Sequence, residues 1–291
     1  MNITTAKRAG FCFGVKRAVD MTFDEAKKGD DVFTLGPIIH NPQVIENLKL
    51  QGVAPSDSID NRRIKTLIIR THGVPVEVSE RLANKKYRVI DATCPFVKKA
   101  QQYAKLLKED GYQVLIIGDR EHPEVKSLMS YAGAEVVVLG RDDDLPKLKS
   151  RVGVVVQTTQ PIGILKKFVC EAMGQVNEIK VFNTICNSTA LRLKETEELA
   201  KKVDVMVVVG GRNSANTTQL AHLCADKEVQ CYHIETASEL KAVWFKGKNN
   251  VGITAGASTP DWIIKEVQDR IREIGGMGQD GRSTKRRNSR H

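Results

Sequence analysis

Cys94-Pro-Phe-Val-Lys-Lys-Ala100 is the stretch that decides the fold, because two other segments of the chain begin in a similar way. These are Cys12-Phe-Gly-Val-Lys-Arg-Ala18 and Cys186-Asn-Ser-Thr-Ala-Leu-Arg192, and the three cysteines lie 82 and 92 residues apart. Similarity that recurs along a chain indicates repeated structural units. We therefore predict three such units within the 291 residues.

A second set of segments keeps the same spacing. Gly-Pro-Ile-Ile-His40, Gly-Asp-Arg-Glu-His122 and Gly-Gly-Arg-Asn-Ser214 end on polar residues that are again 82 and 92 residues apart. A third set of polar loops, each followed by proline, holds His72 and Ser258 in the first and last units, although its offsets drift. Polar loops at equivalent positions are expected at one edge of each unit.

The local pattern alternates between helices and strands. Apolar residues recur at helical spacing after Cys12 and Cys94, and Pro95 suits a first helical turn that would place Cys94 at the cap. Short apolar runs that read as buried strands lie between the helical stretches. They cover residues 113–117, 136–139, 152–156, 205–209 and 251–254. Such alternation is typical of parallel α/β sheets, which bind ligands beyond the carboxyl ends of their strands.

The sequence thus predicts an α/β fold of three pseudo-threefold-related α/β units, with small, mostly parallel sheets around a central iron–sulfur cavity. The units span residues 12–93, 94–185 and 186–276, and residues 1–11 are a candidate to pair onto the third. Residues 277–291 are Gly-rich and then basic, which predicts a disordered tail.

The net charge and the distribution of apolar residues limit the partners and the location that we expect for the protein. The formal charge of +10 favours anionic substrates or acidic partners. Nucleic acid is not favoured, because no aromatic–basic interleaving accompanies the charge, but a basic RNA-binding protein acting through its tail remains an alternative. No apolar run approaches the roughly 20 residues that span a bilayer, so no membrane is expected. The amino terminus has no apolar signal core, and we predict a cytoplasmic protein.

The three repeated cysteines predict a metal centre. A thiolate at a helix start is stabilised by the helix dipole and free amides, and three of them can hold an iron–sulfur cluster with one iron left open. The alternative is that they are ordinary buried apolar cysteines. The other cysteines stand outside the repeat and are predicted to be structural: Cys170, Cys224 and Cys231.

The polar loops predict an anion site built from histidine, serine and asparagine side chains and helix-start amides. The candidates are His40, His72, His122, Ser214, Asn216 and Ser258. The alternative for any single histidine is a half-buried side chain whose hydrogen bonds are made within the protein. An alternative for the whole protein is a zinc phosphohydrolase in which three histidines bind the metal. Glu124 is a candidate proton donor, with Thr158 and Thr159 placed to orient it, although an acid in a first helical turn also simply favours the dipole.

The chain resembles the 4-hydroxy-3-methylbut-2-enyl diphosphate reductase family from about residue 1 to residue 275. The motifs that carry the resemblance are AGFCFGVKRA, GPIIHNP, RTHGVP, DATCPFV, GDREHPE, VQTTQ, FNTICNST, GGRNSANT and GITAGAST.

The resemblance implies roles for individual residues. Cys12, Cys94 and Cys186 match the three protein ligands of a 4Fe–4S cluster. Glu124 matches the acid that feeds protons to the substrate, beside Thr158. Ala215 stands where some members carry a second serine, so that hydroxyl is missing here. The positions predicted to contact the diphosphate or the rest of the substrate are His40, His72, His122, Thr158, Ser214, Asn216 and Ser258, and His122 and Thr158 are also predicted to take part in catalysis with Glu124.

The resemblance also implies a reaction. A two-electron reductive dehydroxylation of (E)-4-hydroxy-3-methylbut-2-enyl diphosphate would give isopentenyl and dimethylallyl diphosphate, the last step of the non-mevalonate isoprenoid pathway. Electrons would arrive through the cluster, while the protein supplies position and protons. The basic charge of the chain suits an acidic electron donor such as a ferredoxin or flavodoxin.

Overall fold

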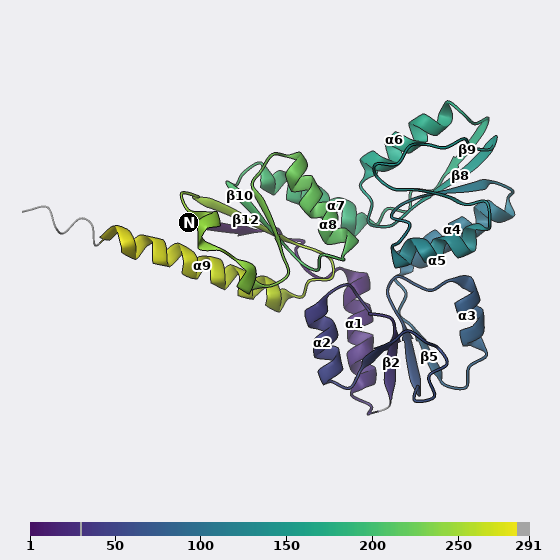
Figure 1. Ribbon diagram of the computed structural model, residues 1–291, viewed down its shortest axis with the longest axis horizontal. Coiled ribbons are helices and arrows are strands. Elements are labelled where there is room, and N and C mark those ends of the chain that lie inside the picture. The colour runs from purple at the N-terminus through teal and green to yellow at the C-terminus, as the bar shows by residue number, and fades with distance from the viewer. Residues whose placement is uncertain (30, 284–291) are drawn as a thin grey trace, which may run out of the picture. The chain divides into compact units, whose positions relative to one another are not determined.

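The computed structural model describes residues 1–29 and 31–283 and shows an α/β fold (Figure 1). The chain divides into two compact units. The larger unit is Cys12–Ala190, and the smaller unit combines Met1–Phe11 with the chain from Leu191 onward. The larger unit holds two four-stranded sheets and the smaller unit holds one.

The first sheet of the larger unit has the strand order β3-β2-β4-β5, and all its pairs are parallel. One face is packed by a cluster in which Leu67 and Ile69 of β4 meet Leu82 of α3. Parallel strands require crossovers, which helices supply between β2 and β3 and between β4 and β5. The elements are α1 (Phe13–Ala26), β2 (Val32–Leu35), α2 (Pro42–Leu50), β3 (Ala54–Ser56), β4 (Thr66–Ile69), α3 (Val76–Ala83) and β5 (Arg88–Asp91).

The second sheet of the larger unit has the order β7-β6-β8-β9 and is again parallel. Successive strand residues face opposite sides, so Val114 packs in the cluster with α4 and α5 while Leu115 packs in the cluster with α6. The elements are α4 (Pro95–Glu109), β6 (Gln113–Ile117), α5 (Pro123–Ala132), β7 (Val137–Leu139), β8 (Arg151–Val156), α6 (Ile162–Met173) and β9 (Glu178–Val181).

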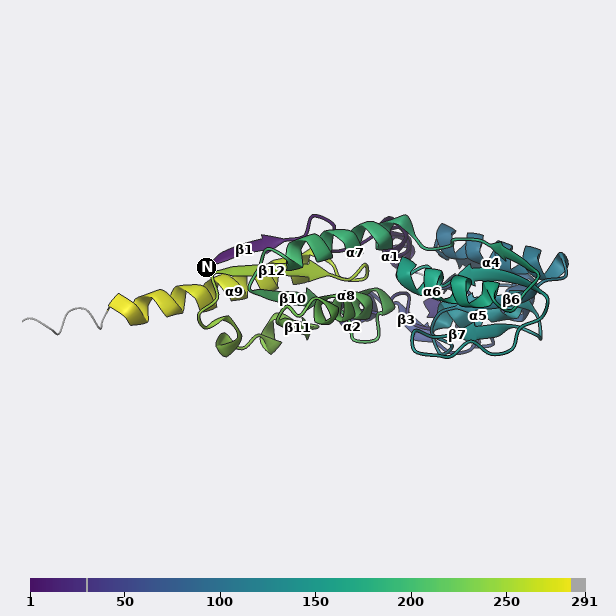
Figure 2. The same ribbon diagram turned by 90° about the horizontal axis from the view of Figure 1, so that it is seen from above.

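The sheet of the smaller unit has the order β1-β12-β10-β11. Strand β1 pairs in parallel with β12, with Asn2 opposite Asn250, and Figure 2 shows the two strands side by side. Val207 faces the cluster with α9, and Val208 faces the cluster with α7 and α8. The elements are β1 (Asn2–Thr5), α7 (Asn187–Ala200), β10 (Val205–Val209), α8 (Ala215–Asp226), β11 (Cys231–Ile234), η1 (Ala237–Glu239), η2 (Ala242–Phe245), β12 (Asn250–Ala255) and α9 (Asp261–Ser283).

The predicted fold class is confirmed: three small parallel sheets of four strands alternate with helices. The unit boundaries at residues 12, 94 and 186 stay a prediction. So does the tail over residues 277–291, of which residues 284–291 lie outside the described part of the chain.

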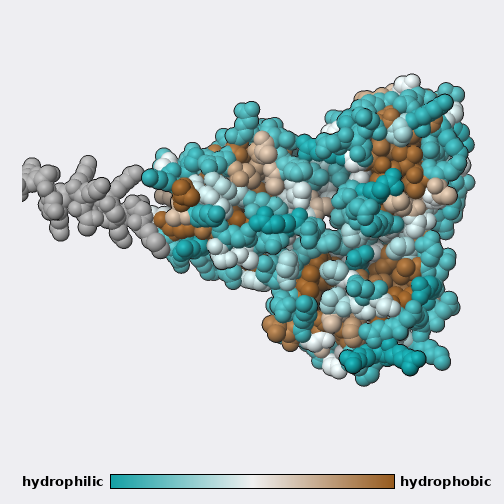
Figure 3. Space-filling view, in the orientation of Figure 1, coloured by the Kyte–Doolittle hydropathy of each residue, from teal (hydrophilic) through white to brown (hydrophobic). Residues whose placement is uncertain are grey.

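No helix within residues 1–29 and 31–283 is long and apolar enough to cross a membrane. The face drawn in Figure 3 is mainly hydrophilic, with its hydrophobic residues gathered in small separate patches. Two large exposed apolar side chains lie just after repeated cysteines: Phe13 follows Cys12 at the start of α1, and Phe96 comes two residues after Cys94 at the start of α4.

Candidate active site

Two of the three repeated cysteines cap helices in the larger unit. Cys12 is the N-cap of α1, and its sulfur accepts a hydrogen bond from the amide of Val15 at 3.5 Å. Cys94 is the N-cap of α4, with Pro95 in the first turn, as the sequence predicted. The Cys94 amide donates to the carbonyl of Thr71 at 3.0 Å, which ties this cap to the loop after β4. Both thiols therefore lie where a helix start favours negative charge.

Cys186 completes the set at the start of α7. Burial, followed by the charges of Cys12 and Cys186, raises the pKa of the Cys94 thiol to about 11. Burial, followed by Cys12 and Glu124, raises the pKa of Cys186. Charge on a neighbouring sulfur thus adds to burial in opposing ionisation of Cys94 and Cys186, and a bound cationic group would offset both effects. This donor set fits an iron–sulfur group, which thiolates hold.

Gly14 permits the close approach of two of these caps. A Cβ atom built at Gly14 would lie 2.6 Å from the Cys94 sulfur and 3.4 Å from its Cβ. Any side chain at this position of α1 would therefore displace the Cys94 thiol. The glycine of the Cys-Phe-Gly segment has a steric role in bringing Cys12 and Cys94 together.

Three histidines of the larger unit lie together in loops that follow parallel strands. His40 follows β2, His72 follows β4 and His122 follows β6. Their ring centroids are 4.5 Å apart for His40 and His72, 5.2 Å for His72 and His122, and 5.6 Å for His40 and His122. One nitrogen from each ring lies within 4.8 Å of the others. This spacing suits one shared ligand, either an anion or a metal ion.

Burial keeps these histidines neutral. It lowers the pKa of His40, lowers that of His72 well below its usual value and lowers that of His122 to about 4. A neutral ring offers one N–H donor. Nδ1 of His122 accepts from the Glu124 amide at 3.2 Å, which leaves the proton on Nε2. Nδ1 of His72 is buried and has no hydrogen-bond partner among the residues that the structure describes. An anionic ligand would satisfy such donors.

Glu124 links the histidine loop to the cysteine loop. Its carboxyl group is 2 % exposed and accepts from the Thr158 amide at 2.7 Å and the Thr158 hydroxyl at 2.9 Å. The carbonyl of Thr158 in turn accepts from the Cys186 amide at 2.9 Å. Burial raises the pKa of Glu124 to about 7, although both Thr158 hydrogen bonds oppose that shift. The acid is therefore poised to give or take a proton near neutral pH.

A polar contact joins α4 and α5 to the loop that follows β4. The Ser127 hydroxyl of α5 donates to the Val74 carbonyl at 2.7 Å and accepts from the Gln101 amide of α4 at 2.7 Å. Ser127 is fully buried, so both bonds are shielded from water. The loop that carries His72 is thereby tied to the helix that begins beside His122.

The remaining predicted residues form a cluster of their own in the smaller unit. Ser214 is the N-cap of α8, and its oxygen accepts from the Thr217 amide and from the Ser258 hydroxyl, at 3.5 Å and 3.3 Å. The side-chain oxygen of Asn216 accepts from the Ala257 amide at 3.0 Å. The structure therefore brings Ser214, Asn216 and Ser258 together at a helix start, where anions are favoured.

Sequence reasoning missed one residue near the histidines. The charge of Arg70 contributes to the lowered pKa of His40, His72 and His122. Arg70 stands in the Arg-Thr-His-Gly motif, but a single arginine in a loop gives no local signal of where its side chain will lie.

Thiols suited to an iron–sulfur group and neutral donors suited to an anion meet at one buried acid, Glu124. This combination is typical of an α/β enzyme, with donor groups that suit a small anion and a metal centre. The chain belongs to the LytB protein family, whose model matches residues 3–272.

Curated relatives are similar in sequence to this chain over almost its whole length. A 4-hydroxy-3-methylbut-2-enyl diphosphate reductase of Pelobacter propionicus is 51% identical over 276 residues, covering 94% of this chain and 99% of the relative. One of Geobacter sulfurreducens is 51% identical over 277 residues, covering 94% and 98%.

Two solved structures of similar fold are reductases of the same kind. An (E)-4-hydroxy-3-methyl-but-2-enyl diphosphate reductase, described as the terminal enzyme of the non-mevalonate pathway, has a TM-score of 0.69 and 45% identity, covering 94% of this chain and 100% of that one. The E-1-hydroxy-2-methyl-but-2-enyl-4-diphosphate reductase of Plasmodium falciparum has a TM-score of 0.83 and 25% identity, covering 93% and 87%. Neither a zinc phosphohydrolase nor an RNA-binding protein finds support in these comparisons.

Proposed function

We propose that this chain reduces (E)-4-hydroxy-3-methylbut-2-enyl diphosphate to isopentenyl diphosphate and dimethylallyl diphosphate. The observation that carries the proposal is the chain of hydrogen bonds from the buried Glu124 through Thr158 to Cys186, one of three cysteines at helix starts. The family and its curated relatives, which bear the name of this reductase, support the same reaction.

The proposal assigns a 4Fe–4S cluster to Cys12, Cys94 and Cys186, with one iron lacking a protein thiolate. When bound, such a cluster would supply single electrons and a Lewis-acidic iron at which a hydroxyl can leave. The raised pKa of Cys94 and Cys186, caused mainly by burial, supports this assignment, because it disfavours these two thiolates without a compensating positive charge.

The polar clusters are assigned to the diphosphate. His40, His72 and His122 would each donate a hydrogen bond from a neutral ring, and the buried Nδ1 of His72 supports the need for a ligand. In the smaller unit, Ser214, Asn216 and Ser258 would bind diphosphate oxygens at the start of α8. Hydrogen bonds to charged oxygens are stronger than neutral ones, and they would fix the carbon chain for reduction.

Glu124 is assigned to proton delivery. Two electrons and two protons convert the substrate to product and water, so one proton goes to the departing hydroxyl and one to carbon. A carboxyl group with a pKa of about 7 is protonated in a large fraction of molecules at neutral pH. Thr158 holds it in place, and His122 would hold the substrate at the beginning of the same helix.

The first test measures iron and acid-labile sulfide after anaerobic purification, with Cys12→Ser, Cys94→Ser and Cys186→Ser in parallel and Cys170→Ser as the control. Cys170 is exposed and lies outside the site. We expect near-equal iron and sulfide, approaching four of each, in the parent and the control but not in the three variants. Reductase activity on the named substrate must follow the iron content. Colourless protein containing zinc would overturn the proposal.

An acidic electron donor, such as a ferredoxin or flavodoxin, completes the proposal. The formal charge of +10 favours an acidic partner. Turnover with such a donor should fall steeply with rising salt, whereas turnover with a small uncharged reductant should not. Equal salt dependence with both reductants would contradict this part.

A further inference from the structure

Two exposed phenylalanine side chains beside the assigned cluster ligands have no role in the proposed function. Phe13 is the first residue of α1 and is 69% exposed, and Phe96 is the second residue of α4 and is 43% exposed. Isolated exposed apolar residues are common and need no explanation, whereas apolar residues gathered in one place mark a surface for a partner. What matters is therefore whether these two helix starts lie together.

The starts of α1 and α4 are in contact. A Cβ atom at Gly14 would lie 2.6 Å from the sulfur of Cys94 and 3.4 Å from its Cβ, so the first turn of α1 packs on the N-cap of α4. Phe13 is one residue from this contact along α1, and Phe96 is two residues from it along α4. Both phenyl groups therefore belong to the surface around one contact.

The same two helices carry a repeated basic pair shortly after the cysteine. The pairs are Lys16 with Arg17 in α1, and Lys98 with Lys99 in α4. One member of each pair is balanced by an acid, because Lys16 lies 2.8 Å from Asp20 and Lys98 lies 2.6 Å from Asp91. The other member of each pair decides the charge of this surface.

Arg17 and Lys99 have no acidic partner among the residues that the structure describes. Arg17 donates to the carbonyl oxygens of Thr93 and Asp91, at 3.4 Å and 3.5 Å, which also ties α1 to the segment before α4. The Lys99 ammonium group is exposed and lies 5.6 Å from the centroid of the Tyr103 ring. Two positive charges next to the exposed phenyl groups are thus left for an external acid.

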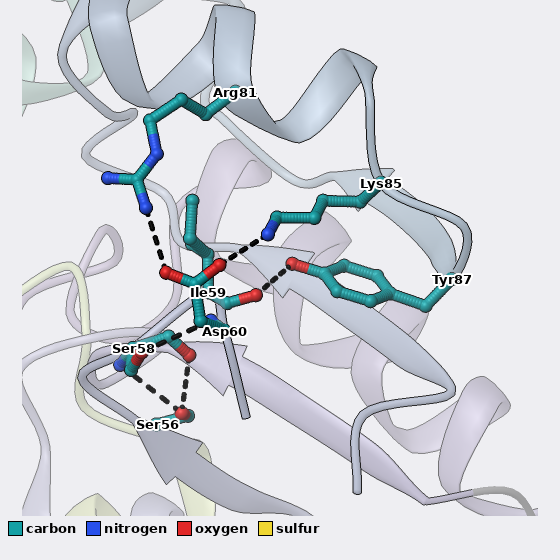
Figure 4. A network of polar contacts seen from close by, with 7 residues as sticks. All are labelled: Ser56, Ser58, Ile59, Asp60, Arg81, Lys85 and Tyr87. Carbon is teal, nitrogen blue, oxygen red and sulfur yellow. Dashed lines mark hydrogen bonds and ion pairs between the residues drawn. The ribbon is translucent and has the colours of Figure 1, made fainter. Parts of the chain in front are cut away.

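The basic residues near α3 show the opposite arrangement. Figure 4 shows Arg81 and Lys85 converging on Asp60, with Nη2 of Arg81 2.8 Å from Oδ2 of Asp60. Donors that are already engaged within the protein gain little from a partner's carboxylate. Arg17 and Lys99, in contrast, are bases whose charge an external carboxylate can match.

The proposed reaction requires a partner at this position. It consumes two electrons, which a cluster would pass on one at a time, so a reduced donor has to come close to the cysteines. Transient redox complexes bury little area, and protein interfaces in general have an aromatic-rich centre and a polar rim. Phe13 and Phe96 suit such a centre, and charged side chains beside them suit the rim.

We propose that the starts of α1 and α4 form the docking surface for a small acidic electron-transfer protein. Phe13 and Phe96 lie at its centre, and Arg17 and Lys99 attract the carboxylates of the partner. The inference rests on the proposed function and adds the place at which electrons enter. Each encounter oxidises the donor by one electron and reduces the cluster by one electron, and no bond forms or breaks in this step.

The first test measures how a small acidic ferredoxin binds to the iron-loaded enzyme by calorimetry, and how fast the reduced ferredoxin reduces the enzyme in stopped flow. Phe13→Ser combined with Phe96→Ser should raise the Kd by roughly tenfold or more, since aromatic anchors carry much of the binding energy of an interface. Phe13→Leu combined with Phe96→Leu should keep most of the affinity. Leu50→Ser, at a residue that is 79% exposed at the end of α2, should match the parent.

The second test removes the charges. Arg17→Gln combined with Lys99→Gln should slow association with the ferredoxin several-fold at low salt and weaken its salt dependence. Lys147→Gln combined with Lys166→Gln is the control, because it removes the same charge from exposed positions outside this surface. Equal effects of the two pairs would show that net charge alone attracts the donor, and would overturn the inference.

Reduction by dithionite keeps two kinds of failure apart. We expect iron content and dithionite-driven turnover to match the parent in all these variants. If they do, and the serine variant binds ferredoxin as tightly as the parent, the inference is wrong while the proposed function stands. A parent enzyme that holds iron but does not reduce the substrate with dithionite would contradict the proposed function itself. If the serine variant loses iron, the two charge pairs decide the inference in the same way.

Discussion

The amide and the hydroxyl of Thr158 both donate to the carboxyl group of Glu124, at 2.7 Å and 2.9 Å. Two donors on one carboxyl group fix its rotation and leave little freedom in a site that is almost fully buried. The Thr158 carbonyl meanwhile accepts from the Cys186 amide. A single residue thus sets the position of the candidate acid relative to a candidate cluster ligand.

Glu124→Gln should abolish most turnover without loss of iron. Glutamine preserves the shape of the side chain but cannot release a proton, so we expect kcat to fall by about 10²- to 10⁴-fold. Glu121→Gln is the matched control, because Glu121 precedes the same helix but is exposed and paired with Lys126. Steady-state assays and iron analysis on both variants give the comparison. A Glu124→Gln enzyme as active as Glu121→Gln would remove Glu124 from the mechanism.

The same substitution should change how stability depends on pH. Burial raises the pKa of Glu124 from 4.5 to about 7, so the folded chain binds this proton more tightly than the unfolded chain. Its contribution to the free energy of unfolding is full below pH 4.5 and is lost as pH rises through about 7. The shift corresponds to on the order of 3 kcal/mol.

Denaturant unfolding of the parent and Glu124→Gln at pH 5 and pH 8 measures this effect. The variant should gain stability relative to the parent at pH 8. Any change in hydrogen bonding to Thr158 contributes at both pH values, so the difference between them isolates the ionisation. A constant offset between the two proteins would show that Glu124 titrates normally.

Gly14→Ala should disrupt the cluster while leaving the helix intact. The added methyl group would lie 2.6 Å from the Cys94 sulfur, so the thiol must move. Gly163→Ala is a matched control, because Gly163 is likewise the second residue of its helix, α6, and a Cβ atom there meets nothing within 4 Å. We expect a lower iron content and an altered electron paramagnetic resonance spectrum for Gly14→Ala only. Identical spectra would show that the thiols adapt.

His72→Asn should weaken substrate binding more than it slows turnover. It removes a half-buried ring of the three-histidine cluster, and we expect KM to rise by roughly tenfold. His222→Asn, at an exposed position in α8, serves as the control. Kinetics with the allylic diphosphate measure the difference. An unchanged KM would argue against a diphosphate at the histidines.

Much of the fold follows from local sequence signals. The apolar runs at residues 113–117 and 205–209 coincide with β6 and β10, because a strand buried on both faces is apolar throughout. Pro95 marked the helix start at Cys94 because proline suits the first turn. Repetition along the chain indicated how many sheets to expect.

The close contacts could not be predicted in the same way. The approach of Gly14 to Cys94 joins two repeats, and no local pattern reports it. The position of the Arg70 side chain depends on Gly36, which is far away in sequence and lies on a neighbouring strand's loop. Candidate residues can therefore be predicted from motifs, whereas their protonation states depend on burial that only the folded chain defines.

The pairing of β1 with β12 has a consequence for synthesis of the protein. Asn2 lies beside Asn250, so β1 leaves the ribosome well before β12, the partner with which it pairs. All strands of the larger unit emerge in the meantime and have only one another to pair with. We expect the larger unit to fold during translation, while β1 stays unpaired until β12 has been synthesised. Shortening the chain before β12 should therefore expose that strand to proteolysis and to chaperones.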